Sequence, residues 1–304
     1  MHTLAIHGGA GVVLARLPQE QRPRYERSLA AILDQAFEVL DQGGACLDAV
    51  AMAVRLLEDD PLFNAGYGAG LAQDGSVELD AAIMDGRTLK AGAVGAIKHL
   101  KNPIELARRV MDDTQHVLMV GSGAEEFALQ CGMQLVNNDY FKTTERRRQL
   151  ENAQRGRLAE LAAATPNAVG TVGAVALDSR GNLAAGTSTG GMTNKLPGRL
   201  GDSPLIGAGT YAKNGVCAVS ATGHGEYFIR TVAAHHIAAA VEYRHVSLGR
   251  ATHELIHDVL LPMAGLGGVI AVDAAGSVSM EFNTEGMFRA SRDSNGNRVV
   301  AITR

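Results

Sequence analysis

The chain has 304 residues, which allows one large domain or two ordinary ones and a substantial buried core. Hydrophobic residues make up 46% and charged residues 20%, and the net charge of −4 excludes the bulk basic field of a nucleic-acid binder. The amino-terminal segment is too short and too glycine-broken for a signal peptide, and no apolar run reaches the length of a membrane span. We therefore expect a cytoplasmic protein. Three widely spaced cysteines, Cys46, Cys131 and Cys217, are expected to be small buried side chains in a reducing compartment.

The first half of the chain alternates short apolar stretches with helical patterns. Apolar residues at helical spacing, followed by glycine or proline, predict helices. Short runs rich in β-branched and small apolar residues predict strands. The expected elements are a strand at 3–9, helices at 24–41 and 46–60, strands at 76–86 and 89–97, a helix at 103–113, and a strand followed by a helix within 116–132.

A charged segment follows, from about residue 138 to residue 170. It has no strand pattern and only a weak helical one, which favours a mobile linker. An ordinary surface helix is an equally good interpretation of the same residues.

The second half is rich in short strands. We expect a hairpin over 171–191, a strand over 216–223, helices over 226–244 and 248–264, and strands within 267–283 and 297–303. Because strands and helices occur in blocks in both halves, an α+β fold is expected, with helices packed outside antiparallel sheets.

The sequence HELIH at residues 253–257 is one candidate for chemistry. Two histidines four residues apart on a helix, with a glutamate between them, are typical of zinc metallopeptidases. No histidine follows His257, and the sequence suggests no third metal ligand. A surface helix that carries two histidines by chance is the simpler interpretation.

Thr171, in the stretch NAVGTVGAVALD, is the second candidate. A threonine hydroxyl is a weak nucleophile unless a base removes its proton, and the α-amine of an amino-terminal threonine can be that base. Such an amine titrates near pH 7.7–8.0 and is therefore substantially neutral at physiological pH. Thr171 is internal, so the chain must first be cut between Gly170 and Thr171. Gly170 has no Cβ and leaves its carbonyl open to attack.

The segments around Thr171 resemble the plant-type asparaginase/isoaspartyl peptidase family of N-terminal nucleophile hydrolases. The resemblance extends over almost the whole chain and is carried by HGGAG, PLFNAGYGA, ELDAAIMDG, GTVGAVALD, TSTGG, PGRLGDSP and SATGHGE. It implies an αββα sandwich with two central antiparallel sheets. It also implies one structural domain made of two fragments, residues 1–170 and 171–304, assembled as a dimer of such heterodimers.

The resemblance also implies a role for each matching residue. Thr171 is the nucleophile released by self-cleavage after Gly170, and Thr189 orients its hydroxyl. Arg199 binds the α-carboxylate of the substrate and Asp202 its α-ammonium group. Thr222 and the backbone N–H of Gly223 form an oxyanion hole, and Asn64 reaches the site from the first fragment. A sodium ion is expected on the backbone carbonyls of Leu57, Glu58, Asp60, Phe63, Ala65 and Tyr67.

The implied activity is hydrolysis of the β-amide of L-asparagine and of β-aspartyl dipeptides through a β-aspartyl ester on Thr171, with no organic cofactor. Three alternatives stay open. They are a glycosylasparaginase of the same family, a zinc metallopeptidase that uses HELIH, and a binding protein that never cleaves itself.

Overall fold

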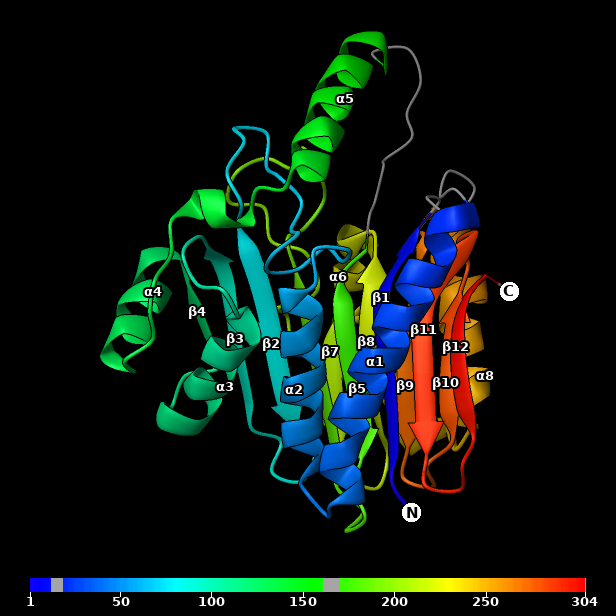
Figure 1. Ribbon diagram of the computed structural model, residues 1–304. Coiled ribbons are helices and arrows are strands. Elements are labelled where there is room, and N and C mark those ends of the chain that lie inside the picture. The colour runs from blue at the N-terminus through cyan, green and yellow to red at the C-terminus, as the bar shows by residue number, and fades with distance from the viewer. Residues whose placement is uncertain (12–18, 161–169, 304) are drawn as a thin grey trace.

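Two stacked β-sheets form the centre of the protein (Figure 1). The structure, a computed structural model, describes residues 1–11, 19–160 and 170–303. The larger sheet has eight strands and the smaller has four in this part of the chain. Apolar side chains from both sheets meet in one buried cluster that includes Val175, Ile270 and Met287. The two sheets are therefore held face to face by a shared hydrophobic core.

The larger sheet brings together the strands from both predicted fragments. Its order is β12 (Arg298–Thr303), β11 (Gly286–Asp293), β1 (Thr3–Gly11), β5 (Val172–Leu177), β6 (Leu183–Thr189), β2 (Leu79–Asp85), β3 (Ala91–Ile97) and β4 (Leu118–Val120). All neighbours are antiparallel except β3 and β4, which pair in parallel. The expectation of two antiparallel sheets is therefore wrong for this edge. A parallel pair needs a crossover connection, and helix α3 (Pro103–Asp113) lies between the two strands in the chain.

The smaller sheet is antiparallel throughout. Its order is β10 (Val278–Phe282), β9 (Gly267–Asp273), β8 (Cys217–Gly223) and β7 (Thr210–Lys213).

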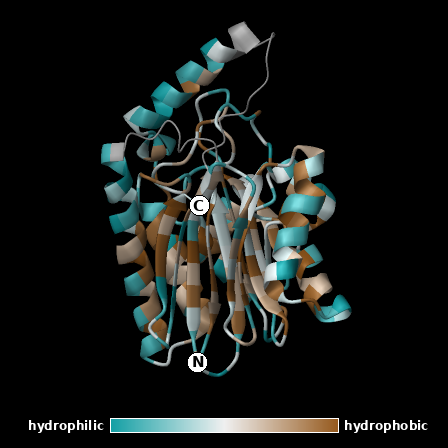
Figure 2. Cartoon of the chain, turned by 90° about the vertical axis from the view of Figure 1, so that its right-hand side faces the viewer, coloured by the Kyte–Doolittle hydropathy of each residue, from teal (hydrophilic) through white to brown (hydrophobic). Residues whose placement is uncertain are grey.

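Helices cover the outer face of each sheet (Figures 1 and 2). On the larger sheet, α1 (Arg22–Asp41), α2 (Cys46–Asp59) and α3 share one core with the strands. Helix α1 shows why: Leu29, Leu33, Phe37 and Leu40 recur at helical spacing and are buried. On the smaller sheet, a second core contains α6 (Gly225–Thr231), α7 (Ala233–Arg244) and α8 (Leu248–His253). The α+β class and the helix–sheet–sheet–helix layering therefore agree with expectation.

Two predicted helices are interrupted. The helix expected over 226–244 breaks at Val232, whose φ of 49° lies in the left-handed region and separates α6 from α7. The helix expected over 248–264 is α-helical only in α8. It continues as a π-helical turn, η4 (Glu254–Leu260), and ends as a 3-10 turn, η5 (Leu261–Met263). Strands β7 and β11 were not expected from the sequence.

The charged segment is helical over most of its length. After α4 (Gly121–Gln130), a short turn η3 (Asn138–Phe141) leads into α5 (Thr144–Glu160), which projects from the sandwich (Figure 1). Buried Arg146 anchors the first turns of α5, because its Nε donates a hydrogen bond to the carbonyl of Gly68. The surface-helix interpretation therefore describes residues 144–160, while residues 161–169 lie outside the described residues. Whether the segment becomes mobile after cleavage stays a prediction.

No helix among the described residues is long and apolar enough to cross a membrane.

Candidate active site

Thr171 lies directly before β5 in the larger sheet, next to the end of the neighbouring strand β6. The register pairs Val172 with Ser188, which places Thr171 beside Thr189. The Thr171 Oγ1 donates a hydrogen bond to the Thr189 Oγ1 at 3.2 Å. The same Thr189 oxygen accepts the backbone N–H of Gly191 at 2.9 Å, which fixes the Thr189 side chain. The structure thus brings together the predicted nucleophile and the residue predicted to orient it.

A pocket opens at this end of the sheets and contains most of the predicted site. Its lining residues are Ala10, Asn64, Gly170, Thr171, Thr189, Gly191, Met192, Arg199, Gly201, Asp202, Ser203 and Gly223. They come from segments far apart in the sequence. The pocket therefore depends on the packing of both predicted fragments.

The backbone of Gly170 lies in direct contact with the backbone of Gly9 in β1. A Cβ added at Gly170 would lie 2.3 Å from the Gly9 Cα, and one added at Gly9 would lie 2.4 Å from the Gly170 Cα. Gly9 also has a φ of +108° and lies where the β1–β11 register shifts. Both positions therefore require glycine because of the contact, and Gly9 also because of its backbone conformation.

The guanidinium of Arg199 is held by Glu226 of α6, a residue that the sequence analysis did not single out. The Arg199 Nε and Nη2 each donate to one carboxylate oxygen of Glu226 at 2.9 Å. This bidentate pair uses one edge of the guanidinium. The opposite edge, formed by Nη1 and Nη2, keeps N–H donors for a second carboxylate.

The carboxylate of Asp202 is buried and incompletely paired. Its side chain is 3% exposed and Oδ2 has no hydrogen-bond partner in the structure. Burial raises the pKa of Asp202 to about 7, although the Arg199 charge opposes the shift. A buried acceptor without a partner, at the wall of a pocket, is suited to bind a cation such as an ammonium group.

Thr222 and Gly223, at the end of β8, occupy different positions relative to the pocket. Gly223 lines it, whereas Thr222 is fully buried and does not. The Thr222 Oγ1 accepts the backbone N–H of Ala10 at 3.2 Å. The predicted oxyanion hole is therefore only partly assembled here, with Thr222 held against the Gly9–Ala10 backbone.

Asn64, from the predicted first fragment, lines the pocket. Its Nδ2 donates to the Gly191 carbonyl at 2.8 Å, and its Oδ1 accepts the backbone N–H of Gly70 at 2.6 Å. Asn64 thereby connects its own loop to the loop that follows Thr189.

Comparison with known proteins decides the family. The asparaginase family profile matches residues 1–302. The chain belongs to the asparaginase family. Among its relatives, the isoaspartyl peptidase of Salmonella typhimurium is 53% identical over 293 residues, which cover 94% of each chain. The isoaspartyl peptidase of Escherichia coli is 51% identical over 293 residues, covering 94% of this chain and 91% of the relative. A probable isoaspartyl peptidase/L-asparaginase 2 of Arabidopsis thaliana is 41% identical, with 98% of both chains covered.

In this asparaginase-family chain, the loop after α2 was predicted to bind sodium. A Cβ added at Gly66 would lie 2.4 Å from the Glu58 carbonyl oxygen, and one at Gly68 would lie 2.8 Å from that of Phe63. The Glu58 carbonyl also accepts the N–H of Tyr67 at 2.7 Å. A carbonyl oxygen has two lone pairs, so this bond leaves acceptor capacity for a cation. The Glu58 and Phe63 carbonyls thus lie against the glycines of this loop, and sodium binding there stays a prediction.

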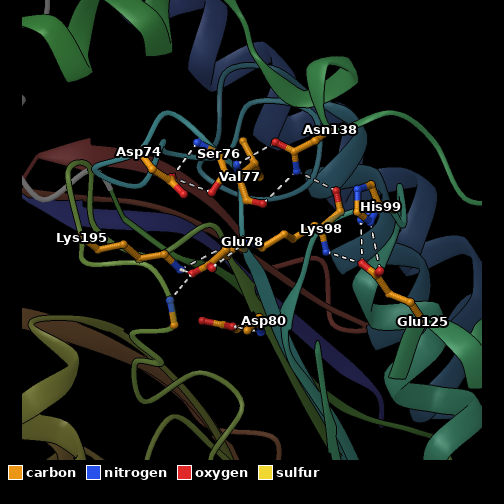
Figure 3. Close-up of polar contacts among 12 residues, drawn as sticks. Asp74, Ser76, Val77, Glu78, Asp80, Lys98, His99, Glu125, Asn138 and Lys195 are labelled. Carbon is orange, nitrogen blue, oxygen red and sulfur yellow. Dashed lines mark hydrogen bonds and ion pairs between the residues drawn. The ribbon is translucent and has the colours of Figure 1, made fainter. Parts of the chain in front are cut away.

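A buried ion pair supports the loop that carries Arg199 in this family member (Figure 3). The Lys195 Nζ lies 3.8 Å from the Glu78 Oε2 and donates to the Glu78 backbone carbonyl at 3.2 Å. Glu78 also accepts the backbone N–H of Gly198 at 2.8 Å and pairs with Lys98 at 3.4 Å. The loop from 195 to 198 is thus fixed at both ends by one carboxylate.

Asp80 lies two residues beyond Glu78 on β2 and is fully buried (Figure 3). Its Oδ1 accepts the backbone N–H of Ala96 at 2.8 Å, and its Oδ2 has no hydrogen-bond partner among the described residues. Burial raises the pKa of Asp80 to about 6, while the charges of Lys195 and Arg199 act in the opposite direction. Glu78 and Asp80 lie in the segment ELDAAIMDG, and Lys195 lies between TSTGG and PGRLGDSP, but their spacing alone indicated no role.

Behind Thr171, the β1 residue His7 belongs to a buried polar chain. The His7 Nε2 is 2.9 Å from the Ser220 Oγ, which lies 2.7 Å from the Thr187 Oγ1. Burial lowers the pKa of His7 to about 3, so its imidazole is neutral at physiological pH. A group this weakly basic is poorly matched to general-base catalysis near neutral pH.

The HELIH motif lies on the outer helix layer, apart from this pocket. The Glu254 carboxylate, which a metallopeptidase needs as a general base, is paired instead with Arg244 at 3.0 Å and Arg250 at 2.7 Å. The sequence suggested no third ligand, but the structure places a candidate beside the two histidines. Glu281, on β10, places a carboxylate oxygen beside both histidines.

Proposed function

We propose that this protein is an isoaspartyl peptidase and L-asparaginase that activates itself by cleaving the Gly170–Thr171 bond. The observation that carries the proposal is the hydrogen bond between the Thr171 and Thr189 hydroxyls in a pocket that also holds Arg199 and Asp202. The names of the relatives from Salmonella typhimurium, Escherichia coli and Arabidopsis thaliana support the same substrates.

Self-cleavage starts from the intact chain. The Thr171 Oγ1 attacks the Gly170 carbonyl carbon, the C–N bond breaks, and the amide nitrogen takes up a proton. Water then hydrolyses the resulting ester. The products are a Gly170 carboxylate and a free Thr171 amine beside its own hydroxyl. The close contact between Gly9 and Gly170 supports this step, because it fixes the carbonyl next to the nucleophile.

The substrate is recognised by one cationic and one anionic group. The free edge of Arg199 binds the α-carboxylate, and the unpaired Oδ2 of Asp202 binds the α-ammonium group. A free amino acid carries one negative charge on its α-carboxylate and one positive charge on its α-ammonium group, which match these two binding groups. With the head so bound, the β-amide of asparagine or of a β-aspartyl dipeptide faces Thr171.

Turnover repeats the same chemistry on the substrate. The Thr171 amine takes the hydroxyl proton, and Oγ1 attacks the β-amide carbon while Thr189 orients it. The backbone N–H of Gly223, which lines the pocket, stabilises the oxyanion, and the Thr222 hydroxyl joins it only after turning toward the pocket from its position against Ala10. Ammonia or an amino acid leaves with a proton from the Thr171 amine. Water, activated by the same amine, then hydrolyses the β-aspartyl ester to aspartate.

The fold, the two fragments, the sodium site and the oligomeric state are inferred from membership of the family. We infer an N-terminal nucleophile hydrolase fold with fragments 1–170 and 171–304, and sodium on the carbonyls of residues 57–67. We also infer a dimer of heterodimers. The exposed apolar side chains of Val117, Leu118, Val120 and Leu129 cluster in sequence around the edge strand β4 and support burial of that edge by a second copy.

The decisive experiment is a time course of freshly purified protein on a denaturing gel. We expect two bands, with the smaller fragment beginning TVGAV on amino-terminal sequencing. Ammonia release from L-asparagine and leucine release from β-aspartyl-leucine should rise with the cleaved fraction. A single intact band with neither activity would refute the proposal. Glycosylated asparagine, tested in parallel, separates a glycosylasparaginase from the proposed enzyme.

Two substitutions make the test specific. Thr171→Ala should stay one chain and release no ammonia. Thr88→Ala, in the exposed turn between β2 and β3, is the matched control and should process and turn over normally. Cleavage at the same bond in Thr171→Ala would contradict the mechanism.

A further inference from the structure

His253, His257 and Glu281 form a cluster on the outer surface of the small sheet's helix layer. One ligand atom from each residue lies within 4.8 Å of the other two. The His257 Nε2 is 3.2 Å and the His253 Nδ1 is 3.9 Å from the same Glu281 oxygen. We propose that these three side chains bind a divalent transition metal of the zinc class, at a site separate from the pocket around Thr171.

The distances suit that metal with small side-chain adjustments. Zinc binds imidazole nitrogen and carboxylate oxygen at about 2.0–2.2 Å, so neighbouring ligand atoms in a tetrahedral site lie roughly 3.3 Å apart. The His257–Glu281 separation is already close to this value, and His253 must move closer to both partners, since the three ligand atoms lie within 4.8 Å of one another. Two imidazoles and one carboxylate also match the ligand preference of zinc, nickel and copper rather than calcium or magnesium.

The backbone places both histidines on the same side of their helix. Residues 254–260 form the π-helical turn η4, directly after α8 ends at His253. A π turn is rare and is found mostly as a single turn within an α-helix, frequently at functional sites. The two imidazole rings lie 4.5 Å apart, centroid to centroid, at 37° to each other.

The strand β10 is fixed against this helix on both sides of Glu281. Alternate residues of a strand share one face, so Ser279, Glu281 and Asn283 all point toward the helix. The Ser279 Oγ is 2.7 Å from the Thr252 Oγ1, and the Asn283 Nδ2 donates to the Ile256 carbonyl at 3.0 Å. These bonds hold the third ligand in register with the two histidines. A site built on fixed elements needs little reorganisation to bind.

The charged side chains near the cluster are engaged by other partners, so they leave the three ligands accessible to a cation. Glu254 is engaged by Arg244 and Arg250, away from the three ligands. Arg289 interacts electrostatically with Glu281, but its Nη1 and Nη2 donate to the carbonyls of Met287 and Thr303. His253 is 60% exposed, so a metal reaches the site from solvent and a fourth position remains for water.

The chemistry expected is binding and cross-linking rather than hydrolysis. A bound metal joins the end of α8 and η4 to β10 and so links the helix layer to the small sheet. A ligand that binds only the folded state raises the unfolding temperature. Without a free general base, the site lacks the second component of a metallopeptidase.

The test uses full-length, tag-free protein stripped with EDTA and titrated with Co²⁺ and then with Zn²⁺. Wild type should bind one Co²⁺ with visible absorption bands typical of four- or five-coordinate cobalt, and Zn²⁺ should abolish those bands. Zn²⁺ should also raise the melting temperature. His257→Ala and Glu281→Gln should each weaken binding at least tenfold and lose the thermal shift.

A second histidine–glutamate pair provides the control. His99 lies 3.0 Å from Glu125 on the surface, in a pair that is not part of a three-ligand cluster among the described residues. His99→Ala should therefore bind Co²⁺ as wild type does. The proposal is overturned if wild type shows no cobalt bands, or if His257→Ala and Glu281→Gln, both confirmed as folded by circular dichroism, bind as tightly as wild type.

Discussion

The backbones of Gly9 and Gly170 lie in direct contact, so close that a Cβ on either residue would overlap the other. Gly9 belongs to β1, near the amino terminus, and Gly170 immediately precedes Thr171. The bond that we propose to be cleaved is thus held by a residue 161 positions away in the chain. We therefore expect cleavage to depend on completed folding of the sheet, because only then do β1 and β5 lie side by side.

Gly9→Ala should slow self-cleavage at least tenfold, which corresponds to about 1.4 kcal/mol in the activation barrier. The added methyl group must push Gly170 away from its position beside Thr171. The measurement is the cleaved fraction against time on a denaturing gel.

Gly43→Ala is the matched control for that variant. Gly43 also has a positive φ, of +77°, but a Cβ there would meet nothing within 4 Å. If both variants are slowed equally, backbone strain rather than the Gly9–Gly170 contact limits cleavage.

Glu226→Gln should raise the KM for L-asparagine about fivefold, which is about 1 kcal/mol, with a smaller change in kcat. Glutamine cannot hold the Arg199 fork through two charged hydrogen bonds, so the guanidinium loses its fixed orientation. Self-cleavage should be unchanged. Glu242→Gln, which disrupts a surface pair with Lys213, is the control. A lower KM in Glu226→Gln would mean that Glu226 competes with the substrate carboxylate.

Lys195→Met should reduce the free energy of unfolding by about 3 kcal/mol, because it leaves the buried Glu78 carboxylate with only the more exposed Lys98 as a cationic partner. Lys195 and Glu78 are both almost fully buried. Lys213→Met breaks a more exposed ion pair and should cost less than about 1 kcal/mol. Urea unfolding of both variants on the single-chain Thr171→Ala background makes the comparison. Equal losses would show that the buried pair has no special role in stability.

The sequence predicted the helix–sheet layers and the residues of the candidate site better than two other features. These are the irregular ends and pairings of elements and the residues that hold the site in place. Local periodicity predicted α1, α2 and α3, because their buried residues follow helical spacing. It could not predict the break at Val232, where a residue with no turn signal takes a left-handed conformation. The pairing of β3 with β4 depends on the crossover through α3, which no single strand encodes.

The site shows the same division. Thr171, Thr189, Arg199 and Asp202 lie in motifs of the family, and the structure places them around one pocket. Glu226 and the contact between Gly9 and Gly170 were not predicted, because each depends on tertiary packing between distant segments. The same holds for Glu281, which completes the histidine cluster from strand β10, far from the two histidines in the sequence.

Substrate binding should weaken as the pH falls through 7. Burial raises the pKa of Asp202 to about 7, so below that pH the carboxyl is protonated and cannot pair with an ammonium group. The inhibition constant of L-aspartate should rise about tenfold per pH unit between pH 6.5 and 5. Succinate has no α-ammonium group and should show no such rise. If both inhibitors respond alike to pH, Asp202 is not the ammonium-binding group.

Asp202→Asn should stabilise the unliganded protein at pH 8. A carboxyl whose pKa is raised in the folded state, here from 3.8 to about 7, favours folding while it is protonated. That contribution is lost as the pH rises from about 4 to 7, and above 7 the buried carboxylate destabilises the fold by on the order of 2–4 kcal/mol. Asparagine cannot ionise and avoids this cost.

The melting temperatures of Asp202→Asn and its parent, both on the Thr171→Ala background, should therefore differ at pH 8 and converge near pH 4. Asp258→Asn, at an exposed aspartate, controls for the loss of one surface charge. An equal difference at both pH values would show that packing around residue 202, and not the buried charge, sets the stability. A stabilised Asp202→Asn protein with weakened L-asparagine binding would mean that the site keeps a charge at the expense of stability because the substrate ammonium needs it.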